Sequence, residues 1–325
     1  MRPVNIAVAG AGVMGRAHMA VIAQNPQCLL SAIADPSEAA QALAQEHGVP
    51  WFATLDALLA KALPNGVILA TPNALHVPQA LQCMAAGVTV LVEKPIAHTL
   101  ADAHKLVYAT QTHSAKVLIG HHRAHSPIMR QAKAVIDEGR LGNLVRADFE
   151  AGQWLPDWRP TQDYRMGYSA NRSQGGGVLL DLIHEVDAAL WLLGDFEHVS
   201  GYAIHASSLE IDSDDCAGIL MARIDGPIAS IRVDYVSRKP VRRYTIVGDR
   251  GTATWDLRAS TIVVEDATGS QVIDLTAGSF DVAMTYVSAM QELLAAIESN
   301  RPSTQPLKEG VRALTTVLRA KRVYS

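Results

Sequence analysis

Residues 4 to 15 read VNIAVAGAGVMG, an apolar run that leads into three glycines, Gly10, Gly12 and Gly15. The run predicts a buried β-strand, and the residues after Gly12 predict the start of a helix. Glycines at this spacing allow a tight turn and a close approach of the backbone to a ligand, and the N–H groups at a helix start attract phosphate. The stretch therefore predicts the first strand, turn and helix of a sheet that binds a pyrophosphate.

The chain up to about residue 120 continues to alternate short apolar runs with alanine-rich helical stretches. Such alternation predicts a parallel, doubly wound sheet whose strands are buried on both faces. Ser37 and Thr99, each with an acid in the first turn that follows, are the expected N-caps of two helices. The expected strands lie near residues 4–10, 29–35, 66–72, 88–94 and 116–122, and the expected helices near 13–24, 37–47, 54–62, 75–86 and 99–113.

After about residue 123 strands and helices no longer take turns. Strand-like runs with polar interruptions between residues 198 and 276 predict a mostly antiparallel sheet. We therefore expect a dinucleotide-binding Rossmann domain over residues 1–122 and a second α/β domain over residues 123–325. The second domain is expected to hold helices near 127–138, 177–193, 282–299 and 308–320, a strand over 144–152 and a loop rich in Trp, Tyr, Arg and Pro over 154–173.

The composition indicates a globular protein that binds small molecules. Of the 325 residues 49% are hydrophobic and 18% charged, and the net charge of -4 comes without a basic block, so we expect neither nucleic acid nor a membrane as a partner. The three cysteines, Cys28, Cys83 and Cys216, lack metal-ligand spacing and indicate reduced thiols. No apolar run is long enough for a membrane helix, and the expected location is the cytoplasm.

Asp35 follows the second expected strand, 20 residues after Gly15. A carboxylate at this place accepts hydrogen bonds from the hydroxyls of an adenosine ribose, which favours NAD over NADP. Arg16 and Ser37 keep NADP possible, because a cation or a hydroxyl nearby can accommodate a 2′-phosphate. The alternative is a glycine turn that only packs a helix on a strand.

Polar residues also follow the other expected strands, where ligands of open α/β sheets bind. These are Thr71, Pro72, Asn73 and His76 after the third strand, Glu93 and Lys94 after the fourth, and His121, His122 and His125 after the fifth. Each group has a structural alternative: an ordinary turn with Asn73 as a helix cap, a surface lysine, and histidines on a loop surface. No acid or cysteine near the histidines completes a metal site, so none is expected.

The expected helix over 177–193 carries Asp181, His184 and Glu185 on one face, at spacings i, i+3 and i+4. A solvated stripe on an amphipathic helix is the alternative to a catalytic pair. Between residues 173 and 222, however, nine acids occur and no Lys or Arg. The partner of a carboxylate on this helix should therefore come from another segment, and Lys94 is the expected candidate.

The glycine turn, Asp35, TPN with His76, EKP, GHHR and the glycine-led helix together resemble the glucose–fructose oxidoreductase / inositol dehydrogenase / MocA family over essentially the whole chain. The resemblance implies a nicotinamide cofactor, a C-terminal α/β domain with an open sheet that carries homo-oligomer contacts in a dimer or tetramer, and a sugar or cyclic polyol as substrate. It implies cofactor contacts from Gly10, Gly12, Val13, Met14, Gly15, Asp35, Thr71, Pro72, Asn73, His76, Glu93, Lys94 and His122.

The oxidation of a secondary alcohol needs a hydride acceptor, a base for the hydroxyl proton and positive charge near the developing alkoxide. His184 is the expected base and Lys94 the polarising cation, while Asp181 orients His184 or relays its proton. In many family members the acid lies four residues before the histidine, whereas here the spacing is three and residue 180 is Leu. The loop over residues 156–173 resembles a subset of the family, which implies substrate contacts from Tyr164, Arg165 and Tyr168 besides Lys94 and His184. An interface or packing role is the alternative for this loop.

These residues predict an NAD(P)-dependent dehydrogenase that acts on a CH–OH group of a sugar, sugar acid or cyclic polyol. A reductase of a ketosugar or imine, or a dihydrodiol dehydrogenase acting on a non-sugar cyclic substrate, would use the same groups. A non-catalytic NAD-binding regulator is a third hypothesis, disfavoured because Lys94, Asp181 and His184 are all present.

Overall fold

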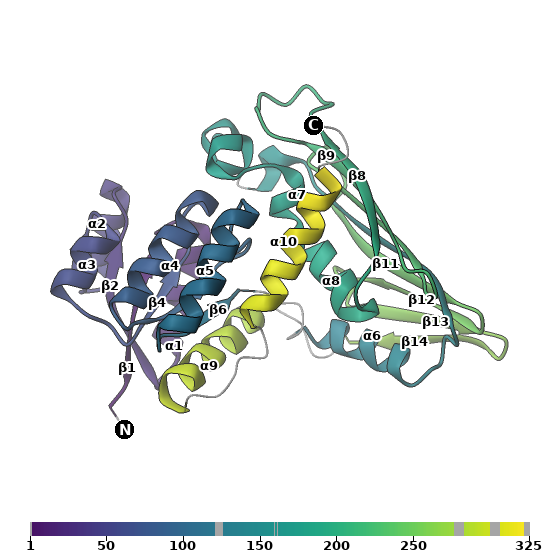
Figure 1. Cartoon of the computed structure of the whole chain (residues 1–325), viewed down its shortest axis with the longest axis horizontal. Helices are drawn as coiled ribbons and strands as arrows, with labels where there is room; N and C mark the ends of the chain where they lie inside the picture. Colours follow the sequence, from purple (N-terminus) through teal and green to yellow (C-terminus); the bar gives the residue numbers. More distant parts are fainter. Residues whose placement is uncertain are drawn as a thin grey trace. The chain divides into compact units, whose positions relative to one another are not determined.

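A computed structural model describes residues 2–120, 126–158, 160, 162–275, 283–299 and 306–321 (Figure 1). They divide into two compact units. One comprises Met1–His122 with Val282–Arg312, and the other Arg123–Asp281 with Ala313–Ser325. The expected domain boundary between residues 122 and 123 lies outside the described residues and stays a prediction.

The first unit contains the predicted parallel sheet, with strand order β3-β2-β1-β4-β5-β6. The order reverses between β1 and β4, which creates the crevice where such sheets bind ligands. Ser37 and Thr99 are N-caps as predicted, since their side chains accept from Ala40 N and Asp102 N. The strands are β1 Val4–Ala9, β2 Cys28–Ala34, β3 Trp51–Phe52, β4 Gly66–Leu69, β5 Thr89–Val92 and β6 Val117–Ile119. The helices are α1 Val13–Gln24, α2 Glu38–Glu46, α3 Leu55–Lys61, α4 His76–Ala85 and α5 Leu100–Thr112.

Helix α9 (Ala283–Ser299) packs in the core of this first unit, against α1 and β5. Its side chains Met290 and Leu293 are fully buried, in one cluster with Ile6 and Met19. The sequence predicts this stretch to be part of the second domain because it follows the strands of that domain. The apolar pattern of a helix does not identify the sheet against which the helix packs. The structure places it in the first unit.

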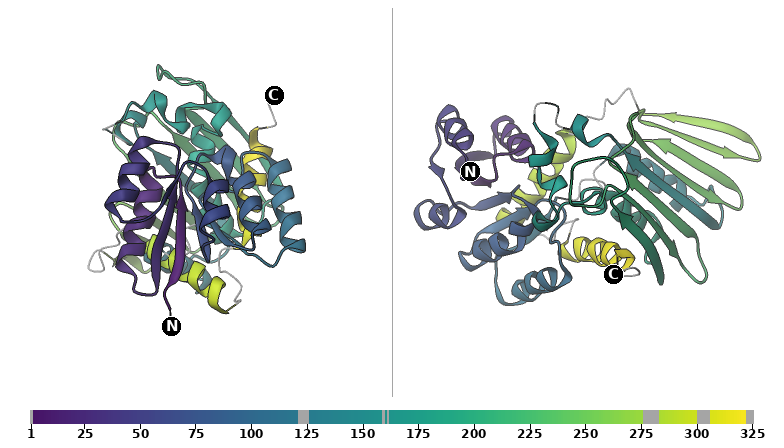
Figure 2. Two further views of the ribbon diagram at one scale, coloured as in Figure 1. Left: turned by 90° about the vertical axis from the view of Figure 1, so that its left-hand side faces the viewer. Right: turned by 90° about the horizontal axis from the view of Figure 1, so that it is seen from above.

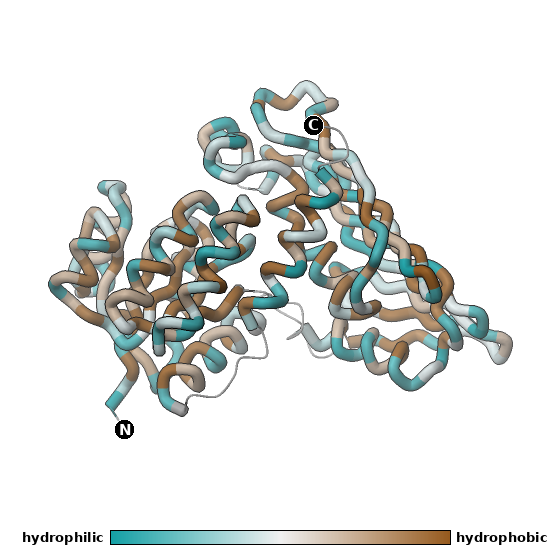
Figure 3. Tube along the Cα trace, viewed as in Figure 1, coloured by the Kyte–Doolittle hydropathy of each residue, from teal (hydrophilic) through white to brown (hydrophobic). Residues whose placement is uncertain are grey.

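The second unit contains an eight-stranded sheet of order β14-β13-β12-β11-β7-β10-β9-β8. Among its described strands only β7 and β10 pair in parallel, which confirms the mostly antiparallel prediction. Figure 2 shows the strands side by side, and Figure 3 shows hydrophobic and hydrophilic residues alternating along them. The strands are β7 Leu144–Gly152, β8 His198–Ile204, β9 Cys216–Ala222, β10 Ile228–Asp234, β11 Val241–Gly248, β12 Gly251–Asp256, β13 Thr261–Asp266 and β14 Gly269–Asp274.

Helices cover one face of this sheet, where inward-facing residues such as Phe149 and Tyr244 are buried (Figure 2). The helices are α6 Pro127–Asp137, α7 Val178–Asp181, α8 Ile183–Leu193 and the part of α10 (Leu307–Lys321) that belongs to this unit. On the opposite face, outward-facing side chains such as Arg146 and Arg232 are exposed. The sheet therefore has one covered and one open face.

The prediction of one continuous helix over 177–193 is wrong, because the helix is interrupted at Leu182, where φ is -97° and ψ is 27°. Asp214 accepts hydrogen bonds from the first two N–H groups of α7. Its carbonyl accepts from Val178 N at 2.8 Å, and its carboxylate accepts from Leu179 N at 3.1 Å. Gly177 has a φ of +115°, and a Cβ there would lie 2.6 Å from the Asp214 carboxylate. This turn therefore requires glycine.

The packing of α9 predicts that Leu293→Ala lowers the free energy of unfolding of the first unit by roughly 2–5 kcal/mol, the usual effect of a buried Leu-to-Ala change. Hydrogen exchange measured under native conditions should speed up in the strands of the parallel sheet. Val272 lies on the edge strand β14 and is 61% exposed. Val272→Ala is therefore the control and should change stability little. Faster exchange confined to the eight-stranded sheet would contradict the assignment of α9.

Candidate functional site

The glycine turn between β1 and α1 has the form of a phosphate cradle. Gly10 has a φ of +92° and lies against the Ala70 carbonyl, and Gly15 packs so closely on the Gly10 carbonyl that neither position has room for a Cβ. Gly12, by contrast, faces open space, with no atom within 4 Å of where its Cβ would be. The turn and the helix packing thus use Gly10 and Gly15, and Gly12 leaves room for a pyrophosphate at the start of α1.

Asp35 lies at the end of β2, directly beside this turn. One carboxylate oxygen accepts from Ala11 N at 2.8 Å, and the other accepts from the backbone N–H and hydroxyl of Ser37, at 2.9 and 2.6 Å. Asp35 is half-buried, so its carboxylate can still accept a hydrogen bond from a hydroxyl group of a ribose. The neighbouring Arg16 is exposed, and its Nε donates to the Ala11 carbonyl at 3.1 Å. The residues present therefore fit a dinucleotide.

The TPN segment after β4 is held by side chains of α4. The Thr71 hydroxyl donates to Gln79 Oε1 at 2.6 Å, and His76 Nε2 lies 2.8 Å from the Thr71 carbonyl oxygen. Asn73 is buried but does not cap α4, which begins at His76. His76 is 1% exposed and its Nδ1 lies 2.8 Å from the Pro95 carbonyl oxygen. A direct hydrogen bond from its ring to a cofactor would require one of these contacts to break.

Glu93, after β5, has a partner that the sequence did not reveal. Its Oε1 lies 2.7 Å from Nε2 of His18, and both side chains are buried, at 4% and 0% exposure. Tyr286 of α9 packs edge-on against the His18 ring at 5.0 Å, and its hydroxyl donates to the Met14 sulfur at 3.8 Å. Burial, and then the Glu93 carboxylate, raise the pKa of Tyr286. The signal for this cluster in the sequence was a histidine directly before the apolar run MAVIA.

The predicted histidine contact falls outside the described residues. His121, His122 and His125 belong to the stretch 121–125, of which nothing is described. The contact of His122 with the cofactor therefore stays a prediction.

In the second unit, Asp181 is 2% exposed and held by two hydroxyl groups. Ser169 Oγ and Tyr235 OH both donate to its Oδ2, each at 2.6 Å. Burial, and then the charge of Asp181, raise the pKa of Tyr235 well above its ordinary value, so the phenol remains a donor. Any further group that Asp181 serves must therefore use Oδ1.

His184 lies in the first turn of α8 and is half-buried, next to the fully buried Glu185. Glu185 accepts from Arg242 at 2.5 Å and from the Tyr244 hydroxyl, and both donors come from β11. Glu185 therefore has a partner from another segment, as expected, and that cation is Arg242, whereas the expected role of Lys94 as a partner of this helix stays a prediction. The alternative of a solvated acidic stripe is wrong, since these carboxylates face the interior.

The loop before α7 contains the expected substrate residues Tyr164, Arg165 and Tyr168. The Arg165 guanidinium pairs with Asp163 at 2.8 Å and with Glu210 at 2.7 Å. The Tyr164 oxygen accepts from Glu210 N at 3.3 Å. These contacts lie within the loop and its neighbour, so a role for the three residues in substrate binding stays a prediction.

None of the described helices is both long and apolar enough to cross a membrane.

Two family models match the chain. The model described as the oxidoreductase family with an NAD-binding Rossmann fold, GFO_IDH_MocA, matches residues 4–121. The model of the GFO/IDH/MocA C-terminal domain matches residues 129–254. Together they cover well over half of the sequence, and the chain belongs to this family of NAD-binding oxidoreductases. The family resemblance, the fold class and the NAD cofactor predicted from the sequence are confirmed.

Individual relatives agree with this assignment. The rhizopine catabolism protein MocA of Rhizobium meliloti is 29% identical over 190 residues, which span 58% of this chain and 57% of that protein. Inositol 2-dehydrogenase of Rhizobium meliloti strain 1021 is 25% identical over 325 residues, 96% of this chain and 94% of that protein. The crystal structure of GenD2 from gentamicin A biosynthesis in complex with NAD has a TM-score of 0.84 at 25% identity, covering 98% of this chain and 93% of that one.

The place of Asp35 predicts that Asp35→Ala weakens NAD binding roughly ten- to a hundredfold, the effect of losing a hydrogen bond to a charged group. NADP should be affected less, because its 2′-phosphate gains nothing from a carboxylate. Dissociation constants of both dinucleotides, measured by calorimetry, test this, with Asp102→Ala on α5 as the control. Equal weakening of both would show that Asp35 acts only through Ala11 and Ser37.

The raised pKa of Tyr235 predicts a pH-dependent contribution to stability. Because the folded-state pKa lies above the ordinary value of 10.0, the unfolded chain loses this proton first. The contribution is therefore fully present below about pH 10 and declines above it, by up to about 1.4 kcal/mol per pH unit.

The variant Tyr235→Phe isolates this effect. It should be less stable than the unchanged protein by about 1.5–3 kcal/mol at pH 8, since one hydrogen bond to a charged group is lost. Denaturation by urea between pH 8 and 11 should then show the difference shrinking above pH 10. Tyr108→Phe, at a residue that is 69% exposed, is the control. A difference that stays constant up to pH 11 would contradict the role of Tyr235.

Proposed function

We propose that the protein is an NAD-dependent dehydrogenase that oxidises a secondary hydroxyl of a sugar, sugar acid or cyclic polyol. The observation that carries the proposal is Asp181, a buried carboxylate that accepts from two hydroxyl groups and lies three residues before His184. A binding module would gain nothing from this arrangement, because burying a carboxylate is unfavourable. The class of substrate is supported by the relative named inositol 2-dehydrogenase.

In this proposal His184 takes the proton of the substrate hydroxyl, since an imidazole exchanges protons near neutral pH. The ammonium group of Lys94 stabilises the negative charge that develops on the substrate oxygen. Asp181 orients the imidazole and balances its positive charge through Oδ1. Bound NAD supplies the hydride acceptor. In the reverse direction the same groups would protonate a ketone.

The spacing of Asp181 and His184 differs from that of many family members, and the structure offers a reason. The break at Leu182 places the two residues on separate helical pieces, α7 and α8. A shorter spacing is tolerated where the helix is interrupted, because the pair no longer depends on the regular turn of one helix. We infer that Asp181 takes the role of the usual family acid.

The substrate prediction is tested by screening NAD reduction against cyclic polyols, aldoses and sugar acids. With the best substrate, Lys94→Ala and His184→Ala should each lower turnover by roughly two or more orders of magnitude, the usual contribution of acid–base groups. NAD affinity, measured by calorimetry, should stay within about threefold. Loss of NAD binding in both variants would instead mark these residues as cofactor or structural residues.

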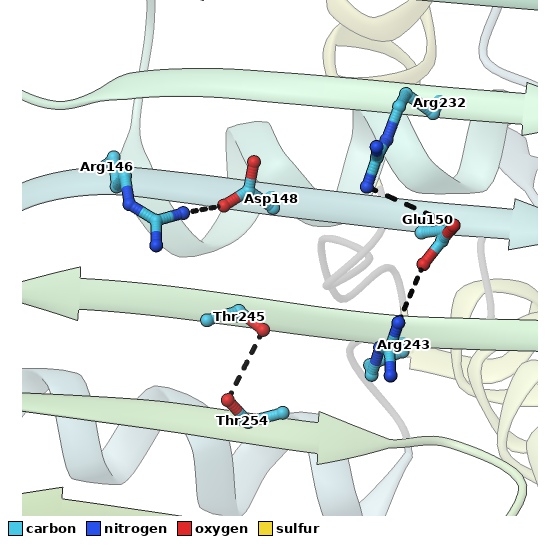
Figure 4. A pocket seen from close by; sticks show the side chains of 7 residues that line it. All are labelled: Arg146, Asp148, Glu150, Arg232, Arg243, Thr245 and Thr254. Carbon is cyan, nitrogen blue, oxygen red and sulfur yellow. Dashed lines mark hydrogen bonds and ion pairs between the residues drawn. The ribbon is translucent and has the colours of Figure 1, made fainter.

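We also propose that the open face of the eight-stranded sheet is a contact between copies of this chain. Figure 4 shows a depression on this face in which Arg146 pairs with Asp148, and Glu150 lies between two arginines. The arginines on Glu150 are Arg232 at 3.9 Å and Arg243 at 3.2 Å. Charges of both signs on one patch suit an isologous contact, in which the same surface meets itself. Around them Tyr202, Leu220 and Ile228 are at least half exposed.

The oligomer proposal predicts that Arg232→Glu combined with Arg243→Glu lowers the sedimentation coefficient, since like charges would then face one another. Arg258→Glu, on an exposed turn outside the depression, is the matched control. An unchanged sedimentation coefficient in the double variant would exclude this face as the contact.

A further inference from the structure

Two buried histidines contact the residues on either side of Lys94. His18 of α1 contacts the side chain of Glu93, and His76 of α4 contacts the carbonyl of Pro95. All of these residues belong to the first unit. The function proposed above assigns no role to the contact of His18 with Glu93 or to that of His76 with Pro95.

Neighbouring residues restrict the positions of both the His18 ring and the Glu93 carboxylate. Since a carboxylate only accepts, His18 donates from Nε2 across 2.7 Å, and its Nδ1 is buried with no hydrogen-bond partner among the described residues. Tyr286 packs on the imidazole ring. Gly120, at the end of β6, lies so close that a Cβ there would be 3.1 Å from the Glu93 carboxylate. Helix α1, which begins at the phosphate cradle, is thereby tied to the residue before Lys94.

His76 ties the TPN segment to the residue after Lys94. Burial lowers the pKa of His76, and the contacts with the Pro95 and Thr71 carbonyls oppose this shift. A neutral imidazole carries one N–H and can donate to only one of the two carbonyls. The contact of Nδ1 with Pro95 is buried, whereas the contact of Nε2 with Thr71 is only partly buried. Water can replace a donor at Thr71 but not at Pro95. We therefore assign the N–H to Nδ1, as the donor to the Pro95 carbonyl.

We propose that His18 and His76 are positioning residues for Lys94. A lysine side chain is flexible, so its ammonium group is placed reproducibly only when the backbone that carries it is held. Here the residues on both sides of Lys94 are held. Helix α1, which begins at the glycine turn, contacts Glu93 through His18, and helix α4 contacts Pro95 through His76. The inference rests on the proposed function for the role of Lys94, but the positioning itself can be tested without a substrate.

The test measures how fast acetic anhydride acylates Lys94 at several pH values, by mass spectrometry of the NAD-bound protein. Lys105, whose side chain is 64% exposed on α5, is the internal standard. Two pairs of variants are compared. His18→Leu removes the donor to Glu93, while in His18→Gln the amide nitrogen can replace Nε2. His76→Gln retains only the Thr71 contact, while His76→Asn can replace Nδ1 at Pro95.

We expect the rate for Lys94, relative to Lys105, to change about fivefold or more in His18→Leu and His76→Gln, the fold-change of one lost hydrogen bond. It should stay within about twofold of the unchanged protein in His18→Gln and His76→Asn. An unchanged rate in His18→Leu and His76→Gln, with both still folded by thermal unfolding, would overturn the proposal. Equal changes in the disruptive and the conservative variants would overturn it too, because both would then report only loosened packing.

If His18→Leu does not fold, the two His76 variants decide the test by the same criteria. The failure of this inference is distinguishable from the failure of the proposed function. Full turnover in Lys94→Ala would remove the lysine from the mechanism, yet it would leave the acylation rates of the histidine variants unaffected.

Discussion

Several carboxylates are buried in the otherwise apolar interior of the second unit, and two of them, Asp181 and Glu185, take donors from distant parts of the chain. Moving an ionised carboxylate out of water is unfavourable by several kcal/mol unless it is hydrogen-bonded or paired. Ser169 and Tyr235 meet this need at Asp181, and Arg242 and Tyr244 meet it at Glu185. The helices α7 and α8 are thus held on the sheet by specific contacts as well as by apolar packing.

The first unit uses the same principle beside Lys94. Glu93 is buried and takes its hydrogen bond from His18, a residue of the helix that begins at the glycine turn. The requirement to satisfy this carboxylate connects the cradle for the cofactor with the segment that carries the lysine. Stability and the arrangement of the site therefore depend on the same contacts.

The sequence predicts the regular part of this structure well, because strands, turns and caps depend on neighbouring residues. The glycine turn, Asp35, both N-caps and the mostly antiparallel sheet are recovered from local patterns. The two-residue strand at Trp51 is too short to produce a pattern, and the contact between Asp214 and the start of α7 joins residues that are 35 positions apart in the chain. The partners of Glu93 and Glu185 are 75 and 57 residues away from them, so no local pattern could identify them.

The packing of α9 has a consequence for biosynthesis. As the polypeptide leaves the ribosome, the parallel sheet emerges first, but the helix that covers Ile6 and Met19 follows only after all eight strands of the other sheet. Until then, part of the apolar surface of the nascent nucleotide-binding unit stays exposed. Surface of this kind promotes aggregation and is the kind that chaperones protect. The core of this unit can therefore close only after translation has passed residue 299.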